Sequence, residues 1–297
     1  MDRVRYEIIL AQLGEVLGLC RNLDLQDELS PTSRFLQYEP CLHRLIEISA
    51  QRVSGERVTG LGLDEQPLYL TALVESAELG ETADYLATCD PDILRPKLRD
   101  ILRGPPLPIE EDSTSNHARN IMFELSLAAK FDRVGVRAHL SEHPDLWIEV
   151  GGKKLLVECK RPFARRAVKD RLSDARRQLD RRFPNEPAGT RGLIALSLSK
   201  VINRGDKVLE YSSEPAGRLA LEKELENMVV ELRGRWKTFE GKKILGVLAH
   251  VITPALDHAA NRYVVAQQTE LHTWARPGSA DQWATHELGA AVEAMRR

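Results

Sequence analysis

Residues 143–160 carry the pattern that most constrains how this 297-residue chain can fold. Two runs rich in apolar residues, 145–150 and 154–160, lie on either side of Gly151 and Gly152. Each run has the length and the composition of a β-strand. Two adjacent glycines suit the central positions of a hairpin turn, because glycine adopts a positive φ angle at little steric cost. The sequence therefore predicts an antiparallel β-hairpin with a two-residue turn.

This turn fixes which residues of the two predicted strands face each other. Counting outward from the glycines pairs Ile148 with Leu155 and Asp145 with Glu158. Directly opposed residues project from the same side of a sheet, with Cβ atoms about 4.5–5.5 Å apart. Lys160 lies two residues beyond Glu158 and so projects from that side as well. We therefore expect two carboxylates and one amine to meet on one face of the hairpin.

A pair of opposed carboxylates needs a physical reason, because like charges directly across a sheet repel each other. A divalent cation between Asp145 and Glu158 would remove that cost. Mg²⁺ prefers oxygen ligands and is commonly held by one or two carboxylates, with water and substrate phosphate at its other positions. The Lys160 ammonium would orient the attacking water and offset negative charge as a phosphodiester reacts. Together the three residues predict metal-dependent hydrolysis of phosphodiester bonds.

The chain after residue 112 alternates between helical and strand patterns. A helix capped by Thr114 or Ser115 is expected to run to about Phe131, and a strongly basic helix is expected over 165–182. The apolar residues at helical spacing in the basic helix are Val168, Leu172, Ala175 and Leu179. The predicted strands cover 134–140, 145–150, 154–160, 192–199, 244–252 and 263–267, and a long helix covers 218–236. This order predicts an α/β fold with a mixed sheet covered by helices.

Residues 1–112 have a different character. They hold 11 Lys and Arg against 21 Asp and Glu, and their apolar residues recur at helical spacing. The proline-rich stretch 104–108 interrupts regular structure, and the acidic residues 110–112 are expected to keep it solvated. We predict an acidic, mainly helical N-terminal domain over 1–112, of unknown role, and a second domain over 113–297.

Residues 153–182 hold 12 Lys and Arg against 4 Asp and Glu. In a chain with a formal net charge of −2, such a block predicts one surface that meets a polyanion. Contacts to phosphate would give salt-dependent affinity without sequence preference. The alternative is an ordinary solvated helix face. The candidate phosphate-binding residues are Arg161, Arg165, Arg166, Lys169, Arg171, Arg176 and Arg177.

The segment formed by Pro144-Asp145, the hairpin and Glu158-Cys159-Lys160 resembles the PD-(D/E)xK nuclease superfamily. The resemblance covers residues 114–200 and implies a restriction-endonuclease-like fold, whose α-β-β-β-α-β core is a mixed β-sheet flanked by helices. It implies that Asp145, Glu158 and the Cys159 backbone carbonyl bind Mg²⁺, for which Mn²⁺ can substitute. It also implies a catalytic role for Lys160.

Two further residues match the family by position. Glu124 matches a glutamate that many members place on the helix before the first core strand, where it would be an additional metal ligand. The alternative is that Glu124 pairs with Arg119 or Arg137. Gln178 matches a glutamine that some members carry on the helix after the Glu-x-Lys strand, where it would contact nucleic acid. The alternative is that Gln178 simply flanks the buried residue Leu179.

The strings themselves are short, and residues 91–92 and 240–242 repeat Pro-Asp and Glu-x-Lys without a hairpin between them. Asp145, Glu158 and Lys160 differ from these repeats because the predicted hairpin pairs their strands and because the surrounding elements follow the expected order. Two structural alternatives stay open for its charged residues. Glu158 could form an ion pair with Lys160 or Arg161, and Lys160 could be a solubilising residue of an edge strand.

The residues and the resemblance together predict a Mg²⁺-dependent nuclease that acts on DNA in preference to RNA, with endonuclease and exonuclease activity as open alternatives. The resemblance implies a role in phage defence, restriction or repair. One competing class is a nuclease-like fold that binds nucleic acid or assembles without turnover. Another is that residues 1–112 carry the function, by forming a homodimer, by binding a partner protein or by covering the basic helix as an occluding anion. The four cysteines are widely spaced, and we see no long apolar run and no signal-peptide pattern, so we expect a cytoplasmic protein without a membrane segment.

Overall fold

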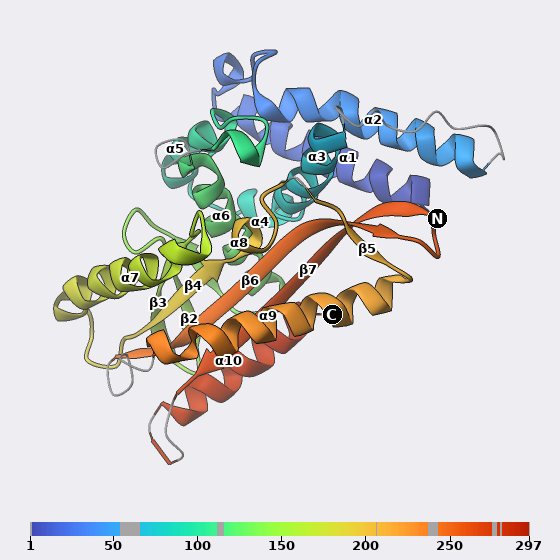
Figure 1. Cartoon of the computed structure of the whole chain (residues 1–297). Helices are drawn as coiled ribbons and strands as arrows, with labels where there is room; N and C mark the ends of the chain where they lie inside the picture. Colours follow the sequence, from blue (N-terminus) through green and yellow to red (C-terminus); the bar gives the residue numbers. More distant parts are fainter. Residues whose placement is uncertain are drawn as a thin grey trace. The chain divides into compact units, whose positions relative to one another are not determined.

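A computed structural model describes residues 2–53, 66–111, 116–205, 207–236, 243–274, 278–279 and 281–296 (Figure 1). The chain divides into two compact units. Unit 1 comprises 1–122, 203–217 and 252–266, and unit 2 comprises 123–202, 218–251 and 267–297. The predicted domain boundary at residues 112 and 113, the predicted helix cap at Thr114 or Ser115 and the second Glu-x-Lys string at 240–242 lie outside the described residues.

The described part of residues 2–111 is mainly helical, as predicted. Its elements are α1 (Asp2–Asn22), η1 (Gln26–Glu28), α2 (Arg34–Val53), α3 (Gln66–Gly80), α4 (Ala83–Leu86), α5 (Pro91–Leu102) and η2 (Pro108–Glu110). Helices α1 and α2 both pack against α3, which is buried from Leu70 to Gly80. The apolar stripe of α1 is buried too, including Tyr6, Leu13 and Leu17. This packing explains why the apolar residues of the N-terminal region recur at helical spacing.

The prediction that residues 110–112 are solvated is wrong for Glu111, which is 3% exposed. Its carboxylate forms an ion pair with Arg119 at 3.1 Å. Arg119 also pairs with Glu75 and donates a hydrogen bond to the carbonyl oxygen of Pro106, at 3.1 Å. A buried carboxylate is stable only when it is paired in this way. These bonds hold the proline-rich stretch in place.

In the part of the chain that the structure describes, the strands form one seven-stranded mixed sheet, which confirms the prediction of an α/β fold with a mixed sheet. They are β1 (Ala138–Leu140), β2 (Leu146–Val150), β3 (Lys153–Lys160), β4 (Arg191–Ser197), β5 (Leu209–Tyr211), β6 (Ile244–Asp257) and β7 (Arg262–Thr273). Their order is β1-β2-β3-β4-β6-β5, and β7 also pairs with β6. The pairs β1–β2 and β2–β3 are antiparallel, whereas β3–β4, β4–β6 and β5–β6 are parallel.

Several details of the sheet differ from the prediction. Strand β2 begins at Leu146, so Asp145 lies directly before the strand rather than in it. Strand β6 continues to Asp257 rather than residue 252. Strand β1 begins at Ala138 rather than residue 134, because the chain turns after α6 at Gly135, whose φ angle is 80°. Strand β7 continues to Thr273. Strand β5 was not predicted, because three residues are too few to show a periodic pattern.

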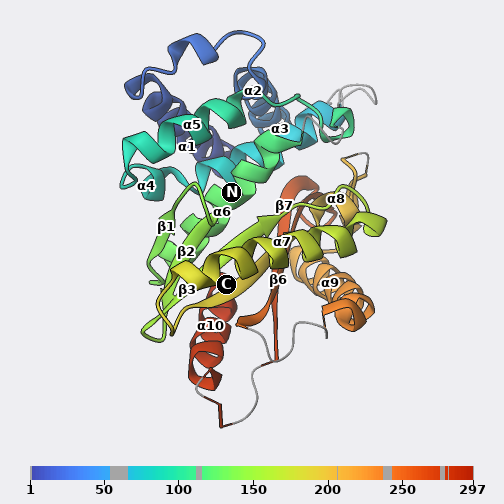
Figure 2. The same cartoon turned by 90° about the vertical axis from the view of Figure 1, so that its left-hand side faces the viewer.

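The helices of the second half are α6 (His117–Arg133), α7 (Val168–Arg182), α8 (Ser199–Ile202), α9 (Glu214–Trp236) and α10 (Gln282–Met295), with 3₁₀ turns η3 (Arg165–Ala167) and η4 (Phe183–Asn185). From α6 to β4 the order is helix, three strands, helix, strand, as predicted. Within unit 2, α7 packs against β3 and β4 (Figure 2). Its predicted apolar residues are all buried. Among the described helices, none combines the length and the apolar character that crossing a membrane requires.

The hairpin has the predicted register. Ile148 lies opposite Leu155 and Val150 lies opposite Lys153 in the antiparallel pair of β2 and β3. The turn glycines, at positions 151 and 152, have φ angles of 57° and 63°. Two successive positive φ angles are typical of a type I′ turn, whose twist matches that of the two strands.

Candidate functional site

The end of β3 brings three oxygen atoms around one amine. Lys160 Nζ lies 3.2 Å from Oε2 of Glu158, 3.6 Å from Oδ2 of Asp145 and 3.0 Å from the carbonyl oxygen of Cys159. The same oxygen of Asp145 accepts a hydrogen bond from the backbone N–H of Cys159, at 2.7 Å. The predicted metal-binding oxygens therefore converge on a single cationic atom. Asp145 lies directly before β2, whose outermost pair is Leu146 opposite Val157, so the hairpin register continued by one residue brings Asp145 to Glu158.

The two faces of β3 have different surroundings. Glu158 and Lys160 share one face, and Arg182 of α7 approaches Glu158 from that side. The intervening Cys159 is buried and projects from the other face. The Glu158 side chain is 1% exposed, while those of Asp145 and Lys160 are 19% and 14% exposed. A ligand that enters from solvent would therefore meet Asp145 and Lys160 before Glu158.

Burial and the charges of the site shift the pKa values of Glu158 and Lys160. Burial, together with the Asp145 carboxylate, raises the pKa of Glu158 to about 7, although Lys160 and Arg182 act in the opposite direction. Burial lowers the pKa of the Lys160 ammonium, but the carboxylates of Asp145 and Glu158 outweigh it, and the pKa lies above its usual value. At neutral pH Lys160 is therefore a cationic hydrogen-bond donor, and Glu158 is close to its own titration midpoint.

Arg182 is a residue of the site that the sequence patterns did not single out. Its Nε lies 3.4 Å from Oε1 of Glu158. Neither atom has a hydrogen-bond partner among the described residues, so the contact is an ion pair without hydrogen-bond geometry. A signal was available, since the apolar spacing of α7, continued three residues past Leu179, arrives at Arg182. Gln178 lies one turn before Arg182, and its Oε1 is buried and accepts no hydrogen bond from the described residues.

Glu124 lies on α6 and is 8% exposed. Burial, followed by the carboxylates of Asp145 and Glu124, raises the pKa of the Cys159 thiol well above its usual range. Glu124 is therefore close enough to β3 to act on it electrostatically. Of its two alternative partners, Arg119 pairs with other carboxylates and Arg137 lies 4.0 Å from Glu149. A role of Glu124 as a metal ligand stays a prediction.

The predicted phosphate-binding residues follow β3 and continue along α7. Arg165, Arg166, Lys169 and Arg177 are exposed, and Arg161, Arg171 and Arg176 are half-buried. Four of them form ion pairs: Arg165 with Glu231, Arg171 and Arg177 with Asp174, and Arg176 with Asp180. Pairs this exposed contribute at most about 1 kcal/mol each, so a phosphate group can compete with the carboxylates.

The donor set of the site fits magnesium better than zinc. Within the described ranges, no group of three or more His, Cys, Asp and Glu side chains is placed to hold a metal ion. The oxygen donors at the end of the hairpin are the Asp145 and Glu158 carboxylates and the Cys159 backbone carbonyl. Such a mixed oxygen shell is typical of Mg²⁺.

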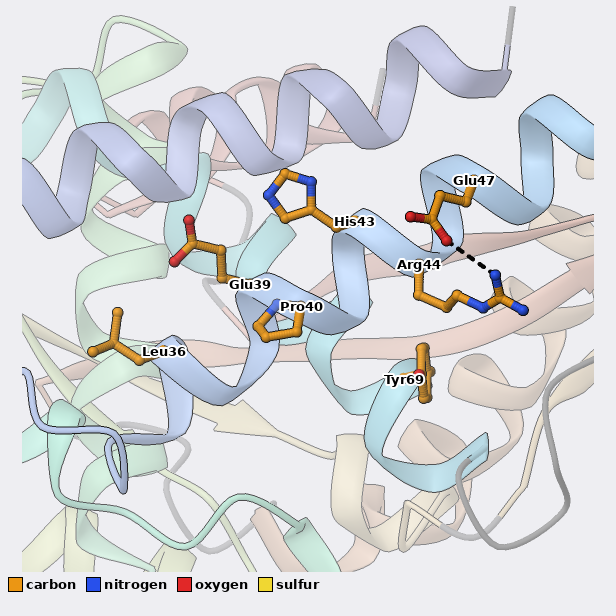
Figure 3. Close-up of a pocket in the computed structure, with 7 residues that line it drawn as sticks. All are labelled: Leu36, Glu39, Pro40, His43, Arg44, Glu47 and Tyr69. Atoms are coloured by element: carbon orange, nitrogen blue, oxygen red, sulfur yellow. Dashed lines mark hydrogen bonds and ion pairs between the residues drawn. The ribbon is translucent and has the colours of Figure 1, made fainter.

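A separate hollow of about 520 Å³ lies in unit 1, along α2 (Figure 3). Glu39, His43 and Glu47 are spaced four residues apart and so follow one face of the helix. Arg44 forms an ion pair with Glu47 at 2.9 Å. The lining residues are Leu36, Glu39, Pro40, His43, Arg44, Glu47 and Tyr69. None of the predicted catalytic, metal-binding or nucleic-acid-binding residues lines this hollow.

Comparisons with protein-family models, with curated proteins and with solved structures gave no match. A functional assignment therefore depends on the geometry of the chain itself.

Proposed function

We propose that this protein is a Mg²⁺-dependent nuclease that hydrolyses phosphodiester bonds in DNA, with a restriction-endonuclease-like core. The observation that carries the proposal is the convergence of the Asp145, Glu158 and Cys159 oxygens on one cationic atom. Oxygens that already surround an ammonium ion offer suitable ligands to a divalent cation. The order of elements from α6 to β4 and the basic residues after β3 support the same proposal.

Asp145, Glu158 and the Cys159 carbonyl would hold Mg²⁺. When bound, Mg²⁺ would supply an activated water and stabilise the leaving oxygen. The Lys160 ammonium would leave the centre of the three oxygens, because two cations repel each other at that distance. Its flexible side chain would keep it beside the site, where it donates hydrogen bonds to the attacking water or to the phosphate. Arg182 would hold the Glu158 carboxylate in place.

Cleavage assays with matched aspartate variants test the proposal. The full chain is incubated with linear, circular and single-stranded DNA in Mg²⁺ or Mn²⁺. Asp145→Asn removes a proposed ligand, and we expect cleavage to fall by at least about 100-fold, since even the outer partners of metal ligands are worth 10- to 100-fold. Asp170→Asn, on the exposed side of α7, is the control and should cleave normally. Equal cleavage by both variants, or no cleavage of any substrate by the unmodified chain, would contradict the proposal.

A second candidate is a nucleic-acid-binding module without turnover. It is favoured by the ion pairs of Glu158 with Lys160 and Arg182, because these already compensate the buried charge without a metal. Thermal unfolding with added Mn²⁺ separates the two candidates. The nuclease should be stabilised by Mn²⁺, and Asp145→Asn should abolish that stabilisation. The binding module should unfold at the same temperature with and without Mn²⁺, while it still binds DNA.

A further inference from the structure

An exposed aromatic ring lies directly after the strand that carries the candidate site. Phe163 is 41% exposed, three residues beyond Lys160. Of the described large apolar residues that are exposed, the others are aliphatic: Ile8, Ile109, Leu219 and Val230. Three residues span at most about 10 Å of extended chain, so the ring lies within a few nucleotides of the site along any bound strand.

A single exposed apolar side chain needs no explanation, but this ring has an unusual neighbour. The ammonium of Lys200 lies over it, 4.1 Å from the ring centroid. Lys200 is 4% exposed, although lysine is almost never fully buried unless its charge is compensated. Attraction between the cation and the electron-rich face of the ring contributes to that compensation. The contact with Lys200 therefore helps to fix the position of the ring, while part of the ring surface stays exposed to solvent.

The sheet topology places this pair beside the site. Strands β3 and β4 are parallel, with Lys160 opposite Leu196. The segments that follow the two strands therefore leave the same edge of the sheet. Phe163 lies on the first segment, and Lys200, in α8, lies on the second. The exposed residues Arg165 and Arg166 follow Phe163 and add positive charge along the same path.

We propose that Phe163, supported by Lys200, is a stacking platform for an unpaired nucleobase next to the scissile phosphate. The inference rests on the proposed function and narrows its substrate to single-stranded or locally unpaired nucleic acid. Stacking of a base on an aromatic side chain contributes about 1–3 kcal/mol and tolerates any base, because every base has a π face. Paired bases inside a duplex are already stacked and gain little from the ring. Phosphates on either side of the stacked base would meet the arginines.

Binding measurements with the full chain in a metal chelator test the platform without cleavage. Fluorescence anisotropy would report the Kd for an oligothymidylate and for a blunt duplex. Phe163→Leu keeps an apolar cover over Lys200 but removes the aromatic ring. We expect it to weaken binding of the single strand by about 5- to 150-fold, the equivalent of 1–3 kcal/mol, and to leave duplex affinity unchanged.

Two further variants sharpen the result. Phe163→Trp should bind the single strand at least as well as the unmodified chain, because it retains a stacking surface. Leu219→Ala removes an exposed apolar residue of α9 and should change neither affinity. Circular dichroism and thermal unfolding of each variant show that it folds. Single-strand affinity that is equal in Phe163→Leu and the unmodified chain would overturn the platform, and so would an equal loss for the single strand and the duplex.

Cleavage assays keep this inference separate from the nuclease proposal. If the chain cuts DNA but Phe163→Leu binds single strands normally, the platform fails and the nuclease stands. If no DNA is cut but single-strand binding depends on Phe163, the platform stands and the protein is a binding module.

Discussion

The central residue of the site is Glu158, a carboxylate with almost no contact with water. Its charge is balanced locally: Lys160 contacts one of its oxygens and Arg182 the other, while Asp145 adds a second negative charge. When Glu158 is ionised, two cations and two anions leave the cluster neutral. The buried charge is therefore compensated without a metal. The protonation of Glu158 nevertheless changes near neutral pH, because its pKa is raised to about 7.

The first prediction concerns pH. Because the pKa of Glu158 is raised to about 7, protons compete with a metal ion for this carboxylate below neutrality. We expect Mn²⁺ to raise the unfolding temperature more at about pH 8 than at about pH 6. In the metal-free protein, the contribution of Glu158 to the free energy of unfolding changes with pH in the opposite direction. A raised pKa stabilises the fold fully below the ordinary value of 4.5, and this contribution is lost as the pH rises through 7.

The control for this prediction is Glu158→Gln, which cannot titrate. It should lose the Mn²⁺ effect and flatten the pH dependence of the metal-free protein between these limits. A Mn²⁺ shift of the same size at both pH values would show that Glu158 is not a ligand.

The second prediction concerns Arg182. If its guanidinium interacts with Glu158, the variants Arg182→Met and Glu158→Gln should not be additive. Urea unfolding of both single variants and the double variant should give a coupling free energy of about 0.5–3 kcal/mol. Arg176→Met is the matched control, because Arg176 lies on the same helix but pairs with Asp180. Its effect should add to that of Glu158→Gln within about 0.5 kcal/mol. An additive result for Arg182 would assign the 3.4 Å contact no energetic role.

At the scale of elements, the hairpin is the part that the sequence predicts best, and its turn can be tested. Gly152 has a φ angle of 63°, and the space that a Cβ atom would occupy there is open, so Gly152→Ala is strained only through the backbone. We expect it to lower the free energy of unfolding by about 1–2 kcal/mol. Gly189 has equal space but no positive φ angle, so Gly189→Ala should be neutral or slightly stabilising. Equal effects of the two substitutions in urea unfolding would argue against the type I′ turn.

What the sequence predicts and what it misses differ in the range of the interactions. The meeting of Asp145, Glu158 and Lys160 depends on a turn only a few residues away, so local pattern was enough to place them together. The burial of Glu111 depends on Arg119, whose other partner Glu75 is far away in sequence. No periodic pattern carries that information. Arg182 is an intermediate case, because the helical spacing reaches it but the apolar pattern stops short.

At the scale of the whole molecule, unit 1 is built from segments that are distant in sequence. The Tyr6 hydroxyl donates to the carbonyl oxygen of Tyr263 at 2.7 Å, and the Gln66 amide donates to the Tyr263 hydroxyl at 3.1 Å. Arg34 of α2, in turn, contacts the sulfur of Met122 in α6 at 3.8 Å. The N-terminal helices thus share one compact unit with residues 203–217 and 252–266. Residues 1–112 therefore do not make up this unit by themselves.

This arrangement predicts that a chain beginning at residue 113 will not unfold cooperatively. Such a chain would expose buried residues of unit 1, including Ile121 and Met122, and each large apolar side chain that loses its cover costs about 1.5–3 kcal/mol. Several such losses approach the roughly 5–15 kcal/mol by which domains are stable. We expect a broad thermal transition and strong binding of a hydrophobic dye, and both should revert when residues 1–112 are supplied as a second chain. A sharp transition at the full-length temperature would instead show that residues 113–297 fold alone. If the shortened chain does unfold, its loss of DNA binding would report unfolding and not a role of the acidic region. That role is tested instead in the intact chain, by neutralising the exposed carboxylates of residues 1–112 and following the salt dependence of DNA affinity.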